Sequence, residues 1–126
     1  EVLTGYSIVN KEDMIKAAKK IINMGAKSVL LKGGHLKNKM IFDILVSKKE
    51  IKIFPKRKIK TRHTHGTGCT LSSALATCLS QKQSIFKSCK ISLKYVDKAI
   101  LNAPGYGKGF GPLNHLVSFN LRDTNV

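Results

Sequence analysis

The sequence has few cysteines, few acidic residues and no long apolar run, and each shortage argues against a class of protein. Its three cysteines are odd in number and irregular in spacing, which argues against a disulfide framework and favours a reducing compartment. No stretch approaches the roughly 18 consecutive apolar residues that a membrane-spanning helix needs. Residues 1–10 also lack the basic, apolar and small-residue order of a signal peptide. We therefore expect a soluble, cytoplasmic protein that does not associate with membranes.

The shortage of acidic residues leaves a large positive charge. Lysine and arginine number 23 against 7 aspartates and glutamates, a formal net charge of +16. Such an excess favours anionic partners, such as a nucleotide, a nucleic acid or an acidic surface. At 126 residues the chain has the length of one domain and is small for a complete two-substrate enzyme. Because it begins at Glu1 rather than at methionine, we expect that part of the protein precedes it.

Residue patterns in the first half predict one helix and three strands. Apolar residues recur at helical spacing between Asn10, a typical N-cap, and Gly25, a typical helix-ending glycine. Residues 28–31 form a short apolar run, typical of a strand buried on both faces. Helix, glycine and buried strand in this order suggest a parallel α/β unit. Residues 41–46 and 50–54 predict a hairpin.

The second half predicts two more helices and a glycine-rich loop. Helical spacing of apolar residues extends over residues 71–79 and again over residues 84–102. Residues 104–112, PGYGKGFGP, place four glycines between two prolines and predict a loop. Their likeness to a dinucleotide-binding fingerprint is spurious, because the loop follows a helix rather than a strand. Residues 118–126 are polar and aperiodic, and we expect a flexible tail.

A glycine turn precedes the first of these helices, in the stretch RHTHGTGCTLSSALATCLS at residues 62–80. Backbone N–H groups at such a turn point outward, and the helix dipole adds partial positive charge. Residues 66–69 therefore form a suitable cradle for a phosphate or an oxyanion. The turn is not a Walker A loop, because the Lys-Ser/Thr pair is absent. Many such junctions are only tight turns, so the pattern alone leaves both interpretations open.

The cysteine of this turn has three interpretations. In the first turn of a helix, the pKa of the Cys69 thiol should fall below about 8.5, which would make it a general base or a nucleophile. Cys69 could instead be a small apolar residue that packs under the turn. It could also join His63 and His65 as a zinc ligand, but a second pair of ligands is missing, and we expect no metal site here. Cys78 and Cys89 lie on apolar helix faces and are interpreted as core residues.

Four motifs resemble the hydroxymethylpyrimidine/phosphomethylpyrimidine kinases of thiamine biosynthesis, in the order and spacing of that family. The motifs are LLKGGH at residues 30–35, THGTGCTLSSALA at 64–76, LKYVDKAI at 93–100 and GKGFGPLNH at 107–115. The cysteine of HGTGCTLS is specific, because most ribokinase-like relatives carry an aspartate there. The resemblance implies a ribokinase-like α/β fold, a three-layer α/β/α sandwich. Residues 1–126 would be the C-terminal portion of that single kinase domain.

The resemblance also implies a reaction and the residues that perform it. The γ-phosphoryl group of ATP, with Mg²⁺, would be transferred to 4-amino-5-hydroxymethyl-2-methylpyrimidine or to its monophosphate. Cys69 matches the catalytic base, which takes the proton from the acceptor oxygen. The other matched positions are Gly66, Thr67 and Gly68 for the anion hole, and Lys32, Thr64 and Lys94, again with Gly66 and Gly68, for the nucleotide.

The chain departs from the family in length, since it resembles only the C-terminal half. The segment EVLTG at residues 1–5 resembles the end of the family's NxxEAExLxG stretch, whose Asn and first Glu would lie before Glu1. Most of the pyrimidine pocket would lie in the other half. The expected partners are therefore ATP, the pyrimidine substrate, and either the missing N-terminal half or a second copy of the chain.

Two alternatives to an active kinase stay open. The chain could be an inactive remnant whose exposed sheet edge pairs with another chain. It could also be a small basic protein that binds nucleic acid through residues 56–62. No interleaved aromatic residues or helix-turn-helix pattern supports contact with bases, so we expect no specific nucleic acid partner.

Overall fold

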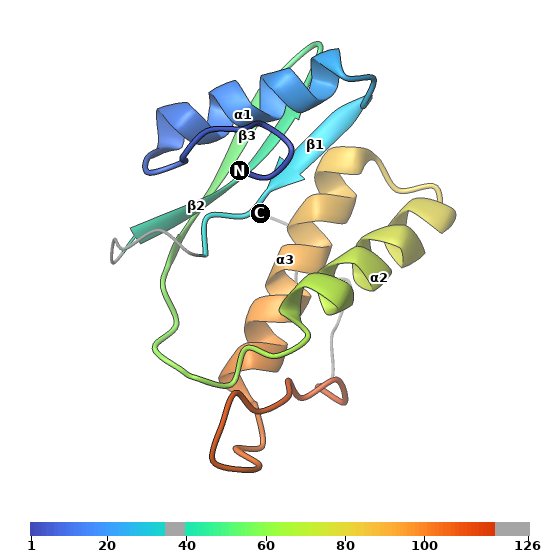
Figure 1. The fold of residues 1–126 in the computed structure, drawn as a ribbon. Coiled ribbons are helices and arrows are strands. Elements are labelled where there is room, and N and C mark those ends of the chain that lie inside the picture. Colours follow the sequence, from blue (N-terminus) through green and yellow to red (C-terminus); the bar gives the residue numbers. More distant parts are fainter. Residues whose placement is uncertain (35–39, 118–126) are drawn as a thin grey trace. The chain divides into compact units, whose positions relative to one another are not determined.

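The computed structural model describes residues 1–34 and 40–117. The chain divides into two compact units, Glu1–Lys58 and Ile59–Val126. Among the described residues, the first unit contains one helix and three strands, and the second contains two helices (Figure 1). The predicted tail at 118–126 lies outside the described residues.

Helix α1, Lys11–Asn23, matches the predicted helix at both ends. The side chain of Asn10 caps it by accepting a 2.8 Å hydrogen bond from the backbone N–H of Asp13. Gly25 follows the last turn with φ of 118°, a left-handed conformation that ends helices. One face of α1 is buried, and its residues are Met14, Ala17, Ala18 and Ile22.

Three strands form one antiparallel sheet in the order β1-β2-β3. They are β1, Ser28–Leu31, β2, Met40–Ser47, and β3, Ile51–Arg57. In their register, Leu31 pairs with Ile44, and Ile44 pairs with Ile53 on the other side. Helix α1 lies across one face of this sheet (Figure 1), and its buried residues pack against apolar side chains of β2. Burial of each large side chain contributes about 1.5–3 kcal/mol to stability.

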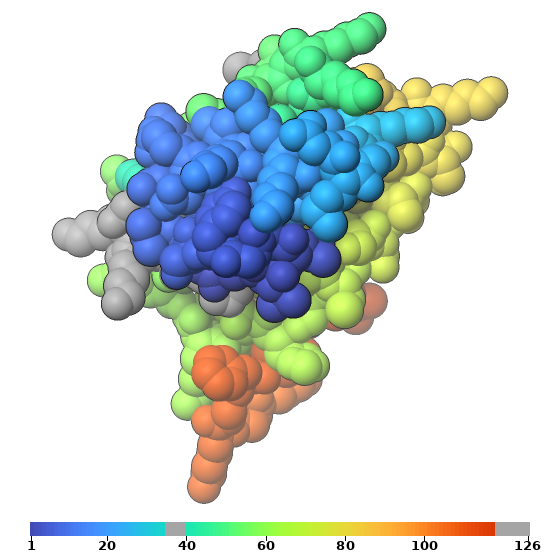
Figure 2. Space-filling model, turned by 45° about the horizontal axis from the view of Figure 1, so that its top comes forward, coloured from blue at the N-terminus to red at the C-terminus, as the bar shows by residue number. Residues whose placement is uncertain are grey.

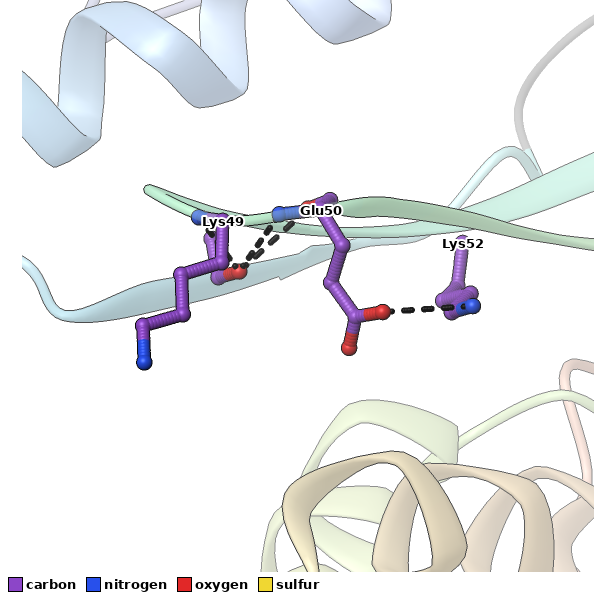
Figure 3. Close-up of polar contacts among 4 residues, drawn as sticks. Lys49, Glu50 and Lys52 are labelled. Carbon is purple, nitrogen blue, oxygen red and sulfur yellow. Dashed lines mark hydrogen bonds and ion pairs between the residues drawn. The ribbon is translucent and has the colours of Figure 1, made fainter.

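The β2–β3 hairpin is confirmed, and its turn is held by a serine. The hydroxyl oxygen of Ser47 accepts hydrogen bonds of 3.2 Å from the backbone N–H groups of Lys49 and Glu50 (Figure 3). The Glu50 carboxylate also lies 3.2 Å from the ammonium of Lys52. This second contact is half-exposed and adds little stability.

The sequence suggested a parallel α/β unit, but the described strands contain no parallel pair. Strand β1 pairs with β2 in the antiparallel sense and is only half-buried along its length. The reason is the short connection between them, residues 32–39. A parallel crossover needs roughly a dozen residues or more, whereas a short loop reverses the chain.

The N-terminal segment lies against α1 in the first unit. The ammonium of Lys20 donates a 2.7 Å hydrogen bond to the carbonyl oxygen of Thr4. The side chains of Lys16 and Lys20 also lie over the ring of Tyr6, at 5.2 and 5.7 Å from its centroid. Figure 2 shows this segment, in dark blue, covering part of the helix. These contacts fix the residues that precede α1.

The second unit is a pair of packed helices, α2, Thr67–Ser80, and α3, Ile85–Leu101. The hydroxyl of Ser84 caps α3 by accepting a hydrogen bond from the N–H of Lys87, so the predicted start of this helix is confirmed. The predicted loop follows α3, and its aromatic side chains Tyr106 and Phe110 are exposed. Within the described residues, no helix combines the length and the apolar character that crossing a membrane requires.

Candidate functional site

The glycine turn adopts a conformation that suits glycine. Gly66 is the N-cap of α2 with φ of 86° and ψ of 1°, in the left-handed region. A side chain at that φ is strained, because its Cβ approaches the following carbonyl. The carbonyl oxygen of Gly66 accepts two hydrogen bonds from Thr70, of 2.9 Å from the backbone N–H and 2.8 Å from the hydroxyl. The turn is therefore closed tightly onto the first turn of the helix.

The N–H of Thr67, one of the positions matched to the anion hole, is used inside the turn. The N–H of Thr67 donates to the carbonyl oxygen of Thr64 at 3.3 Å, so it is engaged within the turn. The N–H groups of Gly68 and Cys69 belong to the first helical turn, where no acceptor exists inside the helix. A Cβ added to Gly68 would meet no atom within 4 Å, so the space in front of the turn is open. No acidic residue lies in the first turn to offset the positive end of the dipole.

Cys69 is the exposed cysteine, whereas Cys78 and Cys89 are buried. Burial raises the pKa of the Cys89 thiol to about 11, so this thiol stays protonated near neutral pH. Cys69 lines a pocket of about 530 Å³, together with residues of α2 and α3, among them Tyr95, and with His115. Of the three cysteines, the one in the glycine turn is therefore the one exposed to solvent.

A chain of hydrogen bonds supports the turn from the residues that follow the glycine loop. The hydroxyl of Thr70 gives its single proton to the carbonyl oxygen of Gly66. The Nε2 atom of His115 lies 2.9 Å from the same hydroxyl oxygen and must therefore be the donor in that contact. The hydroxyl of Tyr95 donates to the carbonyl oxygen of His115 at 3.0 Å.

Sequence reasoning missed the roles of these three side chains. The only signal for His115 was its place at the end of the GKGFGPLNH motif, and Thr70 was part of the glycine-turn motif. Neither motif indicates that the two residues contact each other, because they lie far apart in the chain.

The glycine-rich loop holds the segment that leads into the turn. The guanidinium of Arg62 donates to the carbonyl oxygens of Lys108 and Gly107, at 3.2 and 3.4 Å. The N–H of His65 donates to the carbonyl oxygen of Gly111 at 3.3 Å. A Cβ on Gly111 would collide with the ring of His63, so this position requires glycine. The loop thus fixes the approach to the turn from one side.

The remaining predicted nucleotide residues lie in both units. Thr64 is part of the turn through its carbonyl oxygen, and Lys94 is an exposed residue of α3 beside Tyr95. Both belong to the second unit, with the glycine turn. Lys32 directly follows β1 in the first unit and lines a pocket of about 630 Å³ with residues 1–4.

The zinc interpretation finds no support in residues 1–34 and 40–117, which contain no group of three or more His, Cys, Asp or Glu side chains placed to hold a metal ion. His63 is instead packed against the glycine loop. The His65 backbone forms an isolated parallel bridge with Pro112. Both histidines thus have structural contacts in the second unit.

Comparison with known proteins identifies related sequences. The chain matches the family described as phosphomethylpyrimidine kinase over residues 1–114. It is 40% identical, over 118 residues, to the thiamine biosynthesis bifunctional protein ThiED of Geobacter sulfurreducens. The matched region covers 94% of this chain and 24% of that protein. The chain is 38% identical to the hydroxymethylpyrimidine/phosphomethylpyrimidine kinase of Bacillus subtilis, with 93% and 44% covered. The chain thus spans less than half the length of these relatives.

Solved structures show the same fold. The chain superposes on Bacillus subtilis pyridoxal kinase in complex with ADP with a TM-score of 0.84 at 30% identity, covering 90% of this chain and 45% of that one. For phosphomethylpyrimidine kinase from Clostridium difficile the TM-score is 0.64 at 35% identity, with 79% and 38% covered. These likenesses confirm the predicted α/β class and ribokinase-like fold, of which this chain forms a part.

Proposed function

The chain belongs to the phosphomethylpyrimidine kinase family, and we propose that it carries the phosphate-binding turn and the catalytic base of an ATP-dependent kinase. The kinase transfers the γ-phosphoryl group of ATP to 4-amino-5-hydroxymethyl-2-methylpyrimidine and to its monophosphate, in thiamine biosynthesis. The observation that supports this most directly is the left-handed Gly66 turn, which opens helix α2 beside an exposed cysteine.

The turn acts as the anion hole of the reaction. The N–H groups of Gly68 and Cys69, together with the positive end of the α2 dipole, stabilise negative charge on the transferred group. Preorganised donors of this kind contribute most in phosphoryl transfer, where positioning and charge stabilisation dominate. Loss of one such donor typically costs about 10²–10³ in turnover. Thr67 contributes by closing the turn through Thr64 rather than by binding the anion directly.

Cys69 acts as the general base. Its sulfur accepts the proton of the acceptor hydroxyl as the oxygen attacks phosphorus, and ATP supplies the phosphoryl group. Positions 68 and 69 share one helical turn, so the base and the anion hole are fixed relative to each other by the helix itself. No loop movement is needed to bring them together.

Lys94, in the same unit as the glycine turn, is proposed as a cationic group for the nucleotide phosphates, and Thr64 supports the turn through its carbonyl oxygen. Lys32, in the first unit, is proposed separately as a cationic group for phosphate. The described residues offer no carboxylate cluster for Mg²⁺. Magnesium commonly reaches such enzymes held mainly by the phosphates of the nucleotide and by water.

Pyridoxal is the second candidate acceptor, for a specific reason. The pyridoxal kinase of Bacillus subtilis has the higher TM-score, although the sequence matches the pyrimidine kinase family. Both acceptors are heteroaromatic rings with a hydroxymethyl group, so the turn and the base serve either.

The experiment first measures nucleotide binding and then identifies the phosphoryl acceptor. MgADP and MgATP should raise the melting temperature of the chain, because a ligand that binds only the folded state stabilises it, by about 2.7 kcal/mol at 100 times its Kd. No stabilisation by either nucleotide at millimolar concentration would contradict the proposed site. Phosphorylation assays on the intact gene product, with hydroxymethylpyrimidine and pyridoxal side by side, then decide the acceptor. Faster turnover of pyridoxal would replace the pyrimidine assignment.

A further inference from the structure

A buried carboxylate lies beneath the glycine loop that follows β1. Asp43, in the middle of β2, has 0% of its surface exposed and is the one fully buried charged side chain in the described residues. Its neighbours along the strand, Phe42 and Ile44, are apolar. A charge at such a position lowers stability unless it is paired and hydrogen-bonded, so its presence calls for a specific reason.

One oxygen of this carboxylate is hydrogen-bonded, and the other has an ion-pair contact but no hydrogen bond. Oδ1 accepts a 3.0 Å hydrogen bond from the backbone N–H of Gly33, and Oδ2 lies 2.8 Å from the ammonium of Lys56 on β3. The ammonium comes from a side chain that is 21% exposed, so it supplies positive charge from the edge of the sheet. Hydrogen bonds to an ionised acceptor are shorter and stronger than neutral ones. The carboxylate therefore holds Gly33 more firmly than a neutral acceptor would.

Close packing against the backbone of β2 also holds the loop at Gly33. The β1–β2 ladder ends where Leu31 pairs with Ile44, just before the loop begins. A Cβ on Gly33 would collide with the carbonyl oxygen of Phe42, so the glycine lies directly on β2. Beyond this last pair, the N–H of Gly33 is bonded by the Asp43 carboxylate. The loop is thus held by close packing and by one charged hydrogen bond.

Lys32 lies between the last residue of β1 and this clamped glycine. It lines the 630 Å³ pocket of the first unit, together with Glu1 and Thr4. Asp43 does not line that pocket. Gly33 does line the pocket, so its hydrogen bond to Asp43 links the carboxylate to the pocket wall.

We propose that Asp43 is a positioning residue, which clamps Gly33 and so sets the direction of Lys32 for phosphate binding. The part that concerns phosphate rests on the proposed function, because Lys32 is a nucleotide residue only within it. Lys56 provides the counter-charge that allows the carboxylate to stay buried.

Three variants separate this role from general stability. Asp43→Ala removes the acceptor for Gly33, and Asp43→Asn keeps an acceptor but removes the charge. Ile44→Ala is the matched control, because it removes side-chain volume at a 0% exposed position of the same strand and leaves the acceptor of the Gly33 N–H in place.

The first measurement needs no nucleotide. Amide hydrogen exchange of Gly33, relative to amides inside β2, should rise at least tenfold in Asp43→Ala, less in Asp43→Asn and not in Ile44→Ala. The acetylation rate of Lys32, followed by mass spectrometry, should change in the same order. Equal behaviour of Asp43→Ala and Ile44→Ala in both measurements would overturn the clamp.

The second measurement is the Kd of MgADP at a temperature where all variants are folded. We expect at least fivefold weaker binding in Asp43→Ala, substantial recovery in Asp43→Asn and less than twofold change in Ile44→Ala. If the exchange and acetylation results show that Asp43 holds Gly33, but Asp43→Ala binds MgADP with unchanged Kd, the proposal that Asp43 positions Lys32 for phosphate binding is refuted. If the unaltered chain does not bind MgADP, the proposed function fails, while hydrogen exchange and acetylation still decide whether Asp43 holds the loop.

Discussion

Replacement of Gly66 by alanine separates the shape of the glycine turn from the stability of the chain. Gly66 has φ of 86°, and a Cβ there would meet no atom within 4 Å. The cost of the methyl group is therefore backbone strain alone, about 1–2 kcal/mol for an L-residue in the left-handed region. Gly5 provides a matched control, because it has φ of 75°, is equally free of close contacts, and lies in the other unit.

The two variants should lose similar stability and differ in ligand binding. Both should unfold about 1–2 kcal/mol more easily in urea titrations. In Gly66→Ala, relief of the strain turns the backbone and redirects the N–H groups of Gly68 and Cys69. If the Kd of MgADP rises tenfold, stabilisation by a fixed nucleotide concentration falls from about 2.7 to about 1.4 kcal/mol. In Gly5→Ala the stabilisation by MgADP should stay at its original value.

The assay is thermal unfolding with and without MgADP, with isothermal titration as a check on Kd. The decisive quantity is the difference between the two variants, which removes the shared cost of strain. Equal nucleotide stabilisation in Gly66→Ala and Gly5→Ala would show that the Gly66 turn does not form the phosphate site.

Other substitutions test the neighbours of the turn. In the intact kinase, Cys69→Ala should lower turnover by about 10²–10⁴ with little change in nucleotide affinity, and Cys69→Asp should recover part of the lost turnover. Cys78→Ala should cost only packing stability. Unchanged turnover in Cys69→Ala would refute the role of Cys69 as the base. Thr70→Val should weaken MgADP binding severalfold, because it loses the hydrogen bond to the carbonyl of Gly66. Thr77→Val loses a similar 2.9 Å bond to a helical carbonyl and should leave the binding unchanged. Equal effects of the two variants in calorimetry would contradict the proposed support of Gly66 by Thr70. Burial raises the pKa of the Cys89 thiol from 9.0 to about 11, so the unfolded chain loses this proton at a lower pH than the folded chain does. The free energy of unfolding should therefore fall as pH rises from about 9 to 11. In urea titrations, Cys89→Ala should show a smaller fall over the same pH range.

The elements that sequence predicted well are those marked by local signals. Asn10 and Gly25 delimit α1, and Ser84 starts α3, because caps act on backbone groups within one helical turn. The glycine turn before α2 was also readable, since a left-handed N-cap needs glycine. The hairpin followed from two strand patterns separated by a short polar turn.

The direction of β1 and the donors of the turn could not be predicted in the same way. A four-residue apolar strand looks alike in parallel and antiparallel sheets, and only the short connection to β2 decides. The engagement of the Thr67 N–H by Thr64 depends on the exact path of the turn. Spacing along the sequence carries no signal for either.

The least predictable features are side chains that hold a glycine from a distant part of the chain. Asp43 accepts the N–H of Gly33, and His115 reaches the carbonyl of Gly66 through Thr70. Glycine leaves the backbone free to adopt the required turn, but the same freedom raises the entropic cost of keeping it there. A side chain that bonds to the turn offsets this cost, and its own position in the sequence is unconstrained by helix or strand periodicity. Substitutions chosen at the glycines alone would therefore leave out the residues that give each turn its fixed geometry.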